Sequence, residues 1–189
     1  MSRELWRAIG EKKQKLASEL LKNGRLEVDM TFAHAWTCLH AACERGYTDI
    51  TRKLLEMGSS PDIVDWNGET ALHSAAEHGY VDITKMLLTQ NVQQTPNRTG
   101  QVPLHFAAKK GQVEALEVLL KSFPNHVNIQ DQAGKTPLHE AAQNGHLATV
   151  TLLVKSGAKS DLTSGAGETA ARLAEVNGHL AVVKFLNQI

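Results

Sequence analysis

Histidine and cysteine are the residues of this 189-residue chain with the most obvious chemical potential: it has nine histidines and two cysteines. Imidazole and thiolate groups bind metals and act in acid–base or nucleophilic catalysis. Cys38, His40 and Cys43 lie close together but lack the ligand spacing of a zinc site. The sequence also has no GxSxG, GxxxxGK or HExxH pattern. We therefore expect no catalytic residue, no metal and no cofactor, and we do not expect an enzyme.

Four of the histidines recur at a regular interval, which indicates a structural role. His40, His73, His105 and His139 each follow a leucine and lie 33, 32 and 34 residues apart. Small residues follow each of them, and a glycine comes six residues later. Self-similarity with a period of about 33 residues is typical of a repeat protein. These histidines are therefore expected to belong to a repeated scaffold.

The cleanest copy of the repeat begins at Thr136 and predicts two short antiparallel helices. Thr136 can cap a helix, and Pro137 suits its first position. Leucine and alanines follow at helical spacing until Gly145 ends the helix. A second helix follows at about 147–155, with its own apolar stripe. Such a pair cannot bury its apolar face alone, so successive repeats must stack.

The segment TPLHEAA at 136–142, with its copies that begin at Thr37, Thr70, Val102 and Thr169, resembles the ankyrin repeat. The resemblance covers residues from about 37 to the end and, more weakly, residues 3–36. It implies an all-α solenoid of stacked helix-turn-helix units with projecting β-hairpin-like loops, or fingers. It also implies that each signature histidine bonds the threonine and nearby backbone.

On this basis the chain forms a single domain, residues 1–189, with five recognisable repeats and a degenerate N-terminal capping repeat. The repeats are expected at about 1–34 (cap), 35–67, 68–99, 100–133, 134–166 and 167–189 (C-terminal cap).

Departures from the repeat pattern predict local differences. Residues 31–36 lack the glycine of the other fingers, so an irregular tip is expected. Residues 89–100 are one residue short and include Pro96, which predicts a distorted finger. Val102 replaces the capping threonine, so the following helix should lose its side-chain acceptor. Arg172 replaces the last signature histidine, which suits a C-terminal cap, but a truncated longer protein would look similar.

Charge and hydropathy argue against several classes of protein. The 20 basic and 20 acidic residues balance, so neither a nucleic-acid partner nor a membrane surface is expected. No apolar run approaches the roughly 18 residues of a transmembrane helix, and the N-terminus has no apolar signal-peptide core. The two cysteines are interpreted as reduced core residues, which predicts a cytoplasmic or nuclear location. We also expect a monomer.

The resemblance implies that a partner binds the concave face, formed by the fingers and the first helix of each repeat, at positions that vary between repeats. Trp66 and Arg98 lie at predicted finger tips, and Phe106 follows a signature histidine. Trp and Arg dominate many interfaces. The alternatives are that Trp66 packs against its own or a neighbouring finger and that Phe106 packs partly inward. The candidate partner-binding residues are Trp66, Arg98, Phe106, Lys109, Lys110, Glu77, His78, Ser74, Glu140 and Gln143.

These observations predict a non-catalytic protein–protein interaction scaffold: an adaptor, a regulatory inhibitor or a bacterial effector that binds a protein or peptide. The alternative is a regulatory fragment or subunit of a larger protein whose catalytic activity lies on another domain or chain. A third hypothesis, an enzyme or metal protein, has no motif in its favour. The cluster Lys12, Lys13 and Lys15 is interpreted as solvated cap surface, with a basic contact site as the alternative.

Overall fold

The protein is described by a computed structural model that covers residues 1–23 and 26–189. Within these residues the chain forms twelve α-helices in six antiparallel pairs, which confirms the all-α solenoid. The pairs are α1 (Ser2–Gly10) with α2 (Gln14–Asn23), α3 (Cys38–Arg45) with α4 (Thr48–Glu56), α5 (Ala71–His78) with α6 (Val81–Leu88), α7 (Pro103–Lys110) with α8 (Val113–Ser122), α9 (Pro137–Gln143) with α10 (Leu147–Lys155), and α11 (Ala170–Val176) with α12 (Leu180–Leu186). Two short 3-10 helices, η1 (Ala33–Ala35) and η2 (Pro124–His126), lie in connecting loops.

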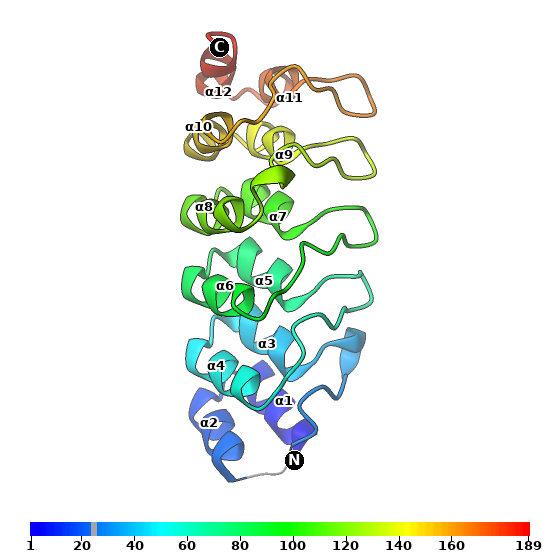
Figure 1. Ribbon diagram of the computed structural model, residues 1–189, viewed down its shortest axis with the longest axis vertical. Coiled ribbons are helices and arrows are strands. Elements are labelled where there is room, and N and C mark those ends of the chain that lie inside the picture. The colour runs from blue at the N-terminus through cyan, green and yellow to red at the C-terminus, as the bar shows by residue number, and fades with distance from the viewer. Residues whose placement is uncertain (24–25) are drawn as a thin grey trace.

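The pairs stack in chain order, so that like helices pack on like helices (Figure 1). The odd-numbered helices form one column and the even-numbered helices form another, and the fingers project beside the odd-numbered column. Small residues allow the odd-numbered helices to pack closely: Ala75, Ala107 and Ala141 are completely buried. Among the described residues, no helix is long and apolar enough to cross a membrane.

Local signals of the repeat start and end these helices as the sequence predicts. The Thr136 hydroxyl accepts a hydrogen bond from the backbone N–H of His139, at 3.4 Å, and α9 begins at Pro137. Gly145 has a φ of 75°, which favours glycine. A Cβ at this position would lie only 2.5 Å from Nδ1 of His179 in the next repeat. Gly145 is therefore required both by the turn and by the packing of one repeat on the next.

Each regular finger tip is held by one polar side chain, of Asp65, Asn97, Asp131 or Ser164, that accepts hydrogen bonds from the backbone of its own turn. Asp131 Oδ1 accepts from the N–H groups of Ala133 and Lys135, at 2.9 and 2.8 Å. Asn97 Oδ1 makes the equivalent bonds to Thr99 and Gln101, at 3.0 and 2.9 Å. The prediction of a distorted finger beside Pro96 is therefore wrong, because the Asn97 amide oxygen closes this tip as the Asp131 carboxylate closes the next.

Segment 89–100 is one residue shorter than its counterparts, and the backbone adjusts to this length before the finger tip. Asn91 adopts a φ of 57°, and the side chains of Val92 and Gln94 turn inward and are buried. Gln94 Oε1 accepts a hydrogen bond from the backbone N–H of Leu104, at 3.3 Å. The first turn of α7 thus keeps a side-chain acceptor, although Val102 cannot supply one. The expected loss of that acceptor is therefore corrected: the acceptor comes from the preceding loop.

The irregular tip expected at residues 31–36 is present. His34 and Ala35 both have a φ of 60°, in the left-handed region that non-glycine residues rarely adopt. The segment is nevertheless closed like the other tips, because the Phe32 N–H donates to the Trp36 carbonyl at 2.8 Å.

Candidate interaction surface

The four signature histidines hold the scaffold together and are occupied on both ring nitrogens. Nδ1 of His139 accepts from the backbone N–H of Thr136 at 3.1 Å, and its Nε2 lies 3.1 Å from the Glu168 carbonyl. His40, His73 and His105 repeat this pattern, with Nε2 on the carbonyls of Glu69, Gln101 and Lys135. A backbone N–H can only donate, so Nδ1 carries no proton and Nε2–H donates to the carbonyl. Each ring is therefore neutral and links one repeat to the finger of the next.

Burial keeps these rings neutral. It lowers the pKa of all four histidines, and that of His73 falls to about 4. In the described part of the chain, no group of three or more His, Cys, Asp or Glu side chains is arranged to hold a metal ion. The scaffold contacts of these four histidines are therefore sufficient to explain why they recur in every full repeat.

The two cysteines are free thiols inside the first helix of the second repeat. Cys38 and Cys43 are buried, and burial raises the pKa of each thiol to about 12. At neutral pH both are protonated, which makes them poor nucleophiles and poor metal ligands.

Trp66 projects from its finger tip and is 60% exposed. Its ring meets the His34 ring edge-on, with 5.1 Å between centroids, and its backbone N–H donates to the His34 carbonyl at 3.0 Å. Trp66 thus packs partly against a neighbouring finger, yet most of its surface remains open. Arg98 is exposed on the next tip, where its N–H donates to the Asn67 carbonyl at 2.8 Å.

Phe106 lies half-buried on α7 and points toward the preceding repeat. Its ring meets the His73 ring edge-on, with 5.1 Å between centroids. Ser74, at the equivalent position on α5, is also half-buried. Phe106 therefore places an apolar ring at the contact between α5 and α7. Trp66 contacts His34 instead, so the two aromatic residues have different neighbours.

The ends of the first helices carry charges that pair across neighbouring repeats. Lys110 Nζ lies 3.1 Å from Glu77 Oε1, and His78 Nδ1 lies 3.7 Å from Glu44 Oε2. Lys109 is exposed and takes part in no ion pair with the described residues. Lys109 thus differs from Lys110 in having no carboxylate of the described residues within ion-pair distance, although its charge acts on Glu140 at longer range.

Glu140 lines a polar recess instead of projecting outward, and Gln143 lies half-buried near it. Glu140 is only 5% exposed, and its carboxylate lies 3.8 Å from Lys135 Nζ, which also bonds the Gln143 amide oxygen. Burial raises the pKa of Glu140. A pocket of about 490 Å³ opens beside these groups and is lined by Thr99, Gln101, Asp131, Gln132, Ala133, Lys135 and Glu140.

The predicted partner-binding residues do not include the residue just before each helix-capping position, although these residues lie on the same surface. Glu69, Gln101 and Lys135 occupy equivalent positions and vary in charge. Gln101 Nε2 donates to Asp131 Oδ2 at 3.1 Å, and Asn97 Nδ2 donates to Glu69 Oε1 at 3.2 Å. Comparison of the repeats at this position alone would have found these residues. His34 could not be found in this way, because its repeat lacks the regular finger.

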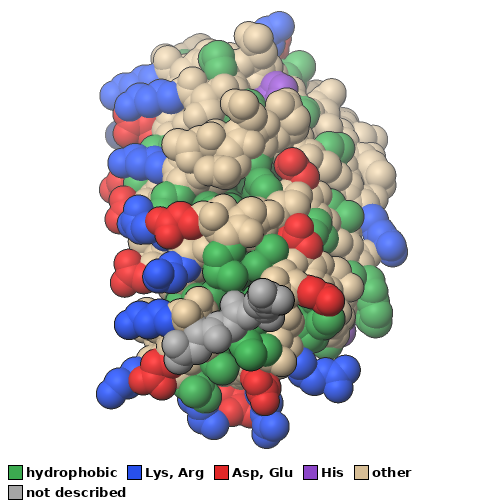
Figure 2. All heavy atoms as spheres, turned by 60° about the horizontal axis from the view of Figure 1, so that its bottom comes forward, with side chains coloured by type: hydrophobic (Ala, Val, Ile, Leu, Met, Phe, Trp, Pro, Cys, Tyr) green, Lys and Arg blue, Asp and Glu red, His purple; other side chains and the backbone are tan. Residues whose placement is uncertain are grey.

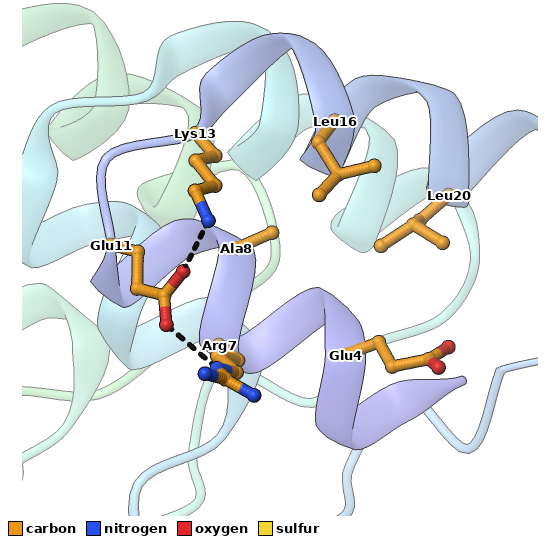
Figure 3. A pocket seen from close by; sticks show the side chains of 7 residues that line it. All are labelled: Glu4, Arg7, Ala8, Glu11, Lys13, Leu16 and Leu20. Atoms are coloured by element: carbon orange, nitrogen blue, oxygen red, sulfur yellow. Dashed lines mark hydrogen bonds and ion pairs between the residues drawn. The ribbon is translucent and has the colours of Figure 1, made fainter.

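A second pocket, of about 460 Å³, lies at the N-terminal end of the stack between α1 and α2 (Figure 3). Leu16 and Leu20 line one side of it, and Glu11 bridges Arg7 at 2.6 Å and Lys13 at 2.7 Å on the other. These contacts hold the pKa of Glu11 at about 2. The predicted lysine cluster is thus partly neutralised by Glu11, which favours the solvated-cap interpretation.

The even-numbered column presents a different surface. Figure 2 shows basic side chains along the left edge of the molecule, the side of the even-numbered helices in Figure 1, with acidic side chains among them. Lys121 of α8, for example, pairs with Glu117 one turn away, at 2.8 Å. This mixed surface is typical of solvated helices.

Comparison with known proteins supports the repeat assignment. A family model described as "Ankyrin repeats (3 copies)" matches residues 5–99, 50–131 and 104–188. The chain is also similar to tyrosine-protein kinase HTK16 of Hydra vulgaris, with 30% identity over 119 residues. The matched segment is 60% of this chain but only 16% of the length of that kinase.

Proposed function

The chain belongs to the ankyrin-repeat family, and from this premise we propose that it is a non-catalytic scaffold that binds a partner protein or peptide. The binding surface is what we call the finger face: the finger tips together with the exposed side chains of α3, α5, α7 and α9. In this proposal the protein acts as an adaptor or regulatory inhibitor, as a monomer, in the cytoplasm or nucleus. It needs no cofactor.

One observation carries the proposal: Trp66 stays 60% exposed at a finger tip although a turn of this kind needs no large side chain. The tip is already closed by Asp65 Oδ1, which accepts from the N–H groups of Asn67 and Glu69 at 2.7 and 2.9 Å. Exposed aromatic residues with polar neighbours have the composition of an interface centre. Phe106 and the exposed Lys109 extend the same face toward the fourth repeat.

The test is a pull-down from cell extract with three forms of the chain, compared by quantitative mass spectrometry. They are the wild type, Trp66→Ala with Phe106→Ala, and a control with Met57→Ala and Leu147→Ala. The control residues are also exposed and apolar, but they flank the even-numbered helices. The proposal expects proteins that the wild type and control retain and the finger-face variant loses. Equal retention by all three forms would contradict it.

A second candidate function is a regulatory part of a larger protein with a catalytic domain elsewhere. It is favoured by the similarity to a tyrosine-protein kinase of which the matched segment is 16%. In that arrangement the finger face would bind either a separate partner or another domain of the same chain. Sequencing of the full-length transcript decides between the two candidates.

A further inference from the structure

The finger face is electrically divided into two halves, and this division defines the chemistry of a partner. We propose that the partner segment is an extended, dipolar peptide with a basic side chain over repeats two and three, an acidic side chain over repeats four and five, and an apolar side chain between them against Phe106. This inference rests on the proposed function, because it specifies the partner of the same surface.

The half formed by repeats two and three is acidic. At its variable positions, which precede the cap or end the first helix, it carries three acidic side chains, Glu44, Glu69 and Glu77, against one basic side chain, Arg45. Burial is the largest cause that raises the pKa of Glu69. The negative charges of Asp65, Glu77 and Glu44 raise it further. Its one side-chain partner among the described residues is the neutral Asn97 amide. A cation brought to Glu69 would relieve this repulsion.

The half formed by repeats four and five is basic. At the equivalent positions and the residue after the histidine it carries Lys109, Lys110 and Lys135, against one acidic side chain, Glu140. Glu140 is 5% exposed at the base of the recess, and its carboxylate lies 3.8 Å from Lys135 Nζ, which offsets part of its charge. Lys109 is exposed and forms no ion pair within the described part of the chain. An anion over this half would meet positive groups first.

The junction between the halves is neutral and partly apolar. Glu77 and Lys110 face each other across it and form an ion pair of 3.1 Å. Phe106 lies at the same level, held edge-on against His73 of α5. The charges farther from the junction are chiefly Glu69 on one side and, on the other, Lys109, which forms no ion pair with the described residues, and Lys135, whose Nζ lies 3.8 Å from Glu140.

The stacking of the helices sets the spacing that the partner must match. Glu69 and Lys135 precede α5 and α9, which are separated by one intervening helix, α7. Packed helices lie about 8–10 Å apart, so the two charges are separated by roughly 16–20 Å. An extended chain rises about 3.3 Å per residue. The basic and acidic side chains of the partner should accordingly be about five or six residues apart.

The experiment selects phage-displayed random twelve-residue peptides on the wild-type protein. The affinities of the enriched peptides are then measured by fluorescence anisotropy. The variants are Glu69→Gln and Lys109→Gln, which remove one charge from each half and leave a polar side chain in its place. The matched controls are Glu114→Gln and Lys85→Gln, exposed residues of α8 and α6. Circular dichroism verifies that every variant is folded.

The expected result is enrichment of peptides that carry a Lys or Arg and an Asp or Glu about five or six residues apart. Each finger-face variant should weaken their binding by about threefold to tenfold, because these pairs are only partly desolvated. The controls should leave the affinity unchanged, and added salt should weaken wild-type binding. In addition, the Lys109→Glu variant should bind a peptide whose acidic residue is replaced by lysine more tightly than it binds the original peptide.

Three outcomes would overturn the inference. If the enriched peptides lose affinity in Phe106→Ala but have no charge pattern, the dipolar partner is wrong and the proposed interaction surface stands. If they are insensitive to Phe106→Ala and to both charge variants, they bind elsewhere and both proposals fall. Failure to enrich any peptide would also contradict the inference, since a twelve-residue segment is long enough to present the required pattern.

Discussion

The histidine network makes a quantitative prediction about how the stability of this protein depends on pH. In the folded protein His73 is completely buried, neutral, and bonded at both ring nitrogens. Its pKa is lowered from 6.5 to about 4, chiefly by burial. A folded state with the lower pKa binds protons less readily than the unfolded chain. The stabilisation is therefore fully present above pH 6.5 and is lost as the pH falls toward 4.

The magnitude follows from the size of the shift. Each pKa unit corresponds to about 1.4 kcal/mol, so protonation of His73 in the unfolded chain alone removes about 3 kcal/mol between pH 6.5 and pH 4. His40, His105 and His139 shift in the same direction for the same reason. Each of these three histidines therefore steepens the dependence of the unfolding free energy on pH in the same direction as His73.

Two carboxyl groups, the buried Glu140 and the half-buried Glu69, act in the opposite direction at lower pH. Burial raises the pKa of Glu69 and Glu140, so at acidic pH these groups bind protons more readily in the folded than in the unfolded state. Their protonation therefore stabilises the folded protein as the pH falls. The measurement is therefore best made between about pH 7.5 and about pH 5.5, where the histidine effect dominates.

The assay is urea unfolding followed by far-UV circular dichroism at several pH values. His73→Asn should reduce the slope of unfolding free energy against pH by up to about 1.4 kcal/mol per unit, because one titrating group is gone. The control Ile83→Val removes a buried methyl group from α6 and should lower stability by about 1 kcal/mol at every pH. If the wild type is equally stable at both ends of the range, or if His73→Asn keeps the wild-type slope, the reasoning is refuted.

Four further predictions follow from the contacts described above. Thr136→Ala should lower the free energy of unfolding by about 1 kcal/mol through loss of its cap, seen as a lower urea midpoint; an unchanged midpoint would exclude that role. Gln94→Ala should speed hydrogen exchange of the Leu104 amide relative to residues 137–143, and equal protection in both forms would show that Gln94 is not a cap. Asn97→Ala should lower thermal stability by about 1–3 kcal/mol, and Asn97→Asp should lower it less, because the carboxylate keeps the acceptor of the tip but loses the Nδ2 donor to Glu69. Trp66→Ala should weaken partner binding, measured by calorimetry, by about 2 kcal/mol with little loss of stability; full-strength binding by this variant, with loss instead on changing the lysines at 12, 13 and 15, would move the site to the N-terminal cap.

The sequence by itself determined the repeated architecture, because the signals that specify it are local and recur. A capping threonine, an apolar face of leucine and alanine and a terminal glycine act within one helix, so Thr136, Pro137 and Gly145 could be assigned without knowledge of neighbours. The variable positions that hold Trp66 and Phe106 followed from the same alignment of repeats. Their chemical type at positions that vary between repeats was enough to make them candidates.

Only the tertiary structure decided how irregular segments are accommodated and which polar groups face solvent. The short segment 89–100 could absorb its missing residue at any loop position, and the outcome depends on whether Asn97 and Gln94 reach the right backbone N–H groups. Glu140 has the sequence position of an exposed contact, yet it is only 5% exposed, and its carboxylate lies 3.8 Å from Lys135 Nζ. Whether a side chain reaches its partner in these contacts depends on the backbone path of each loop, and that path is fixed only when the repeats are stacked.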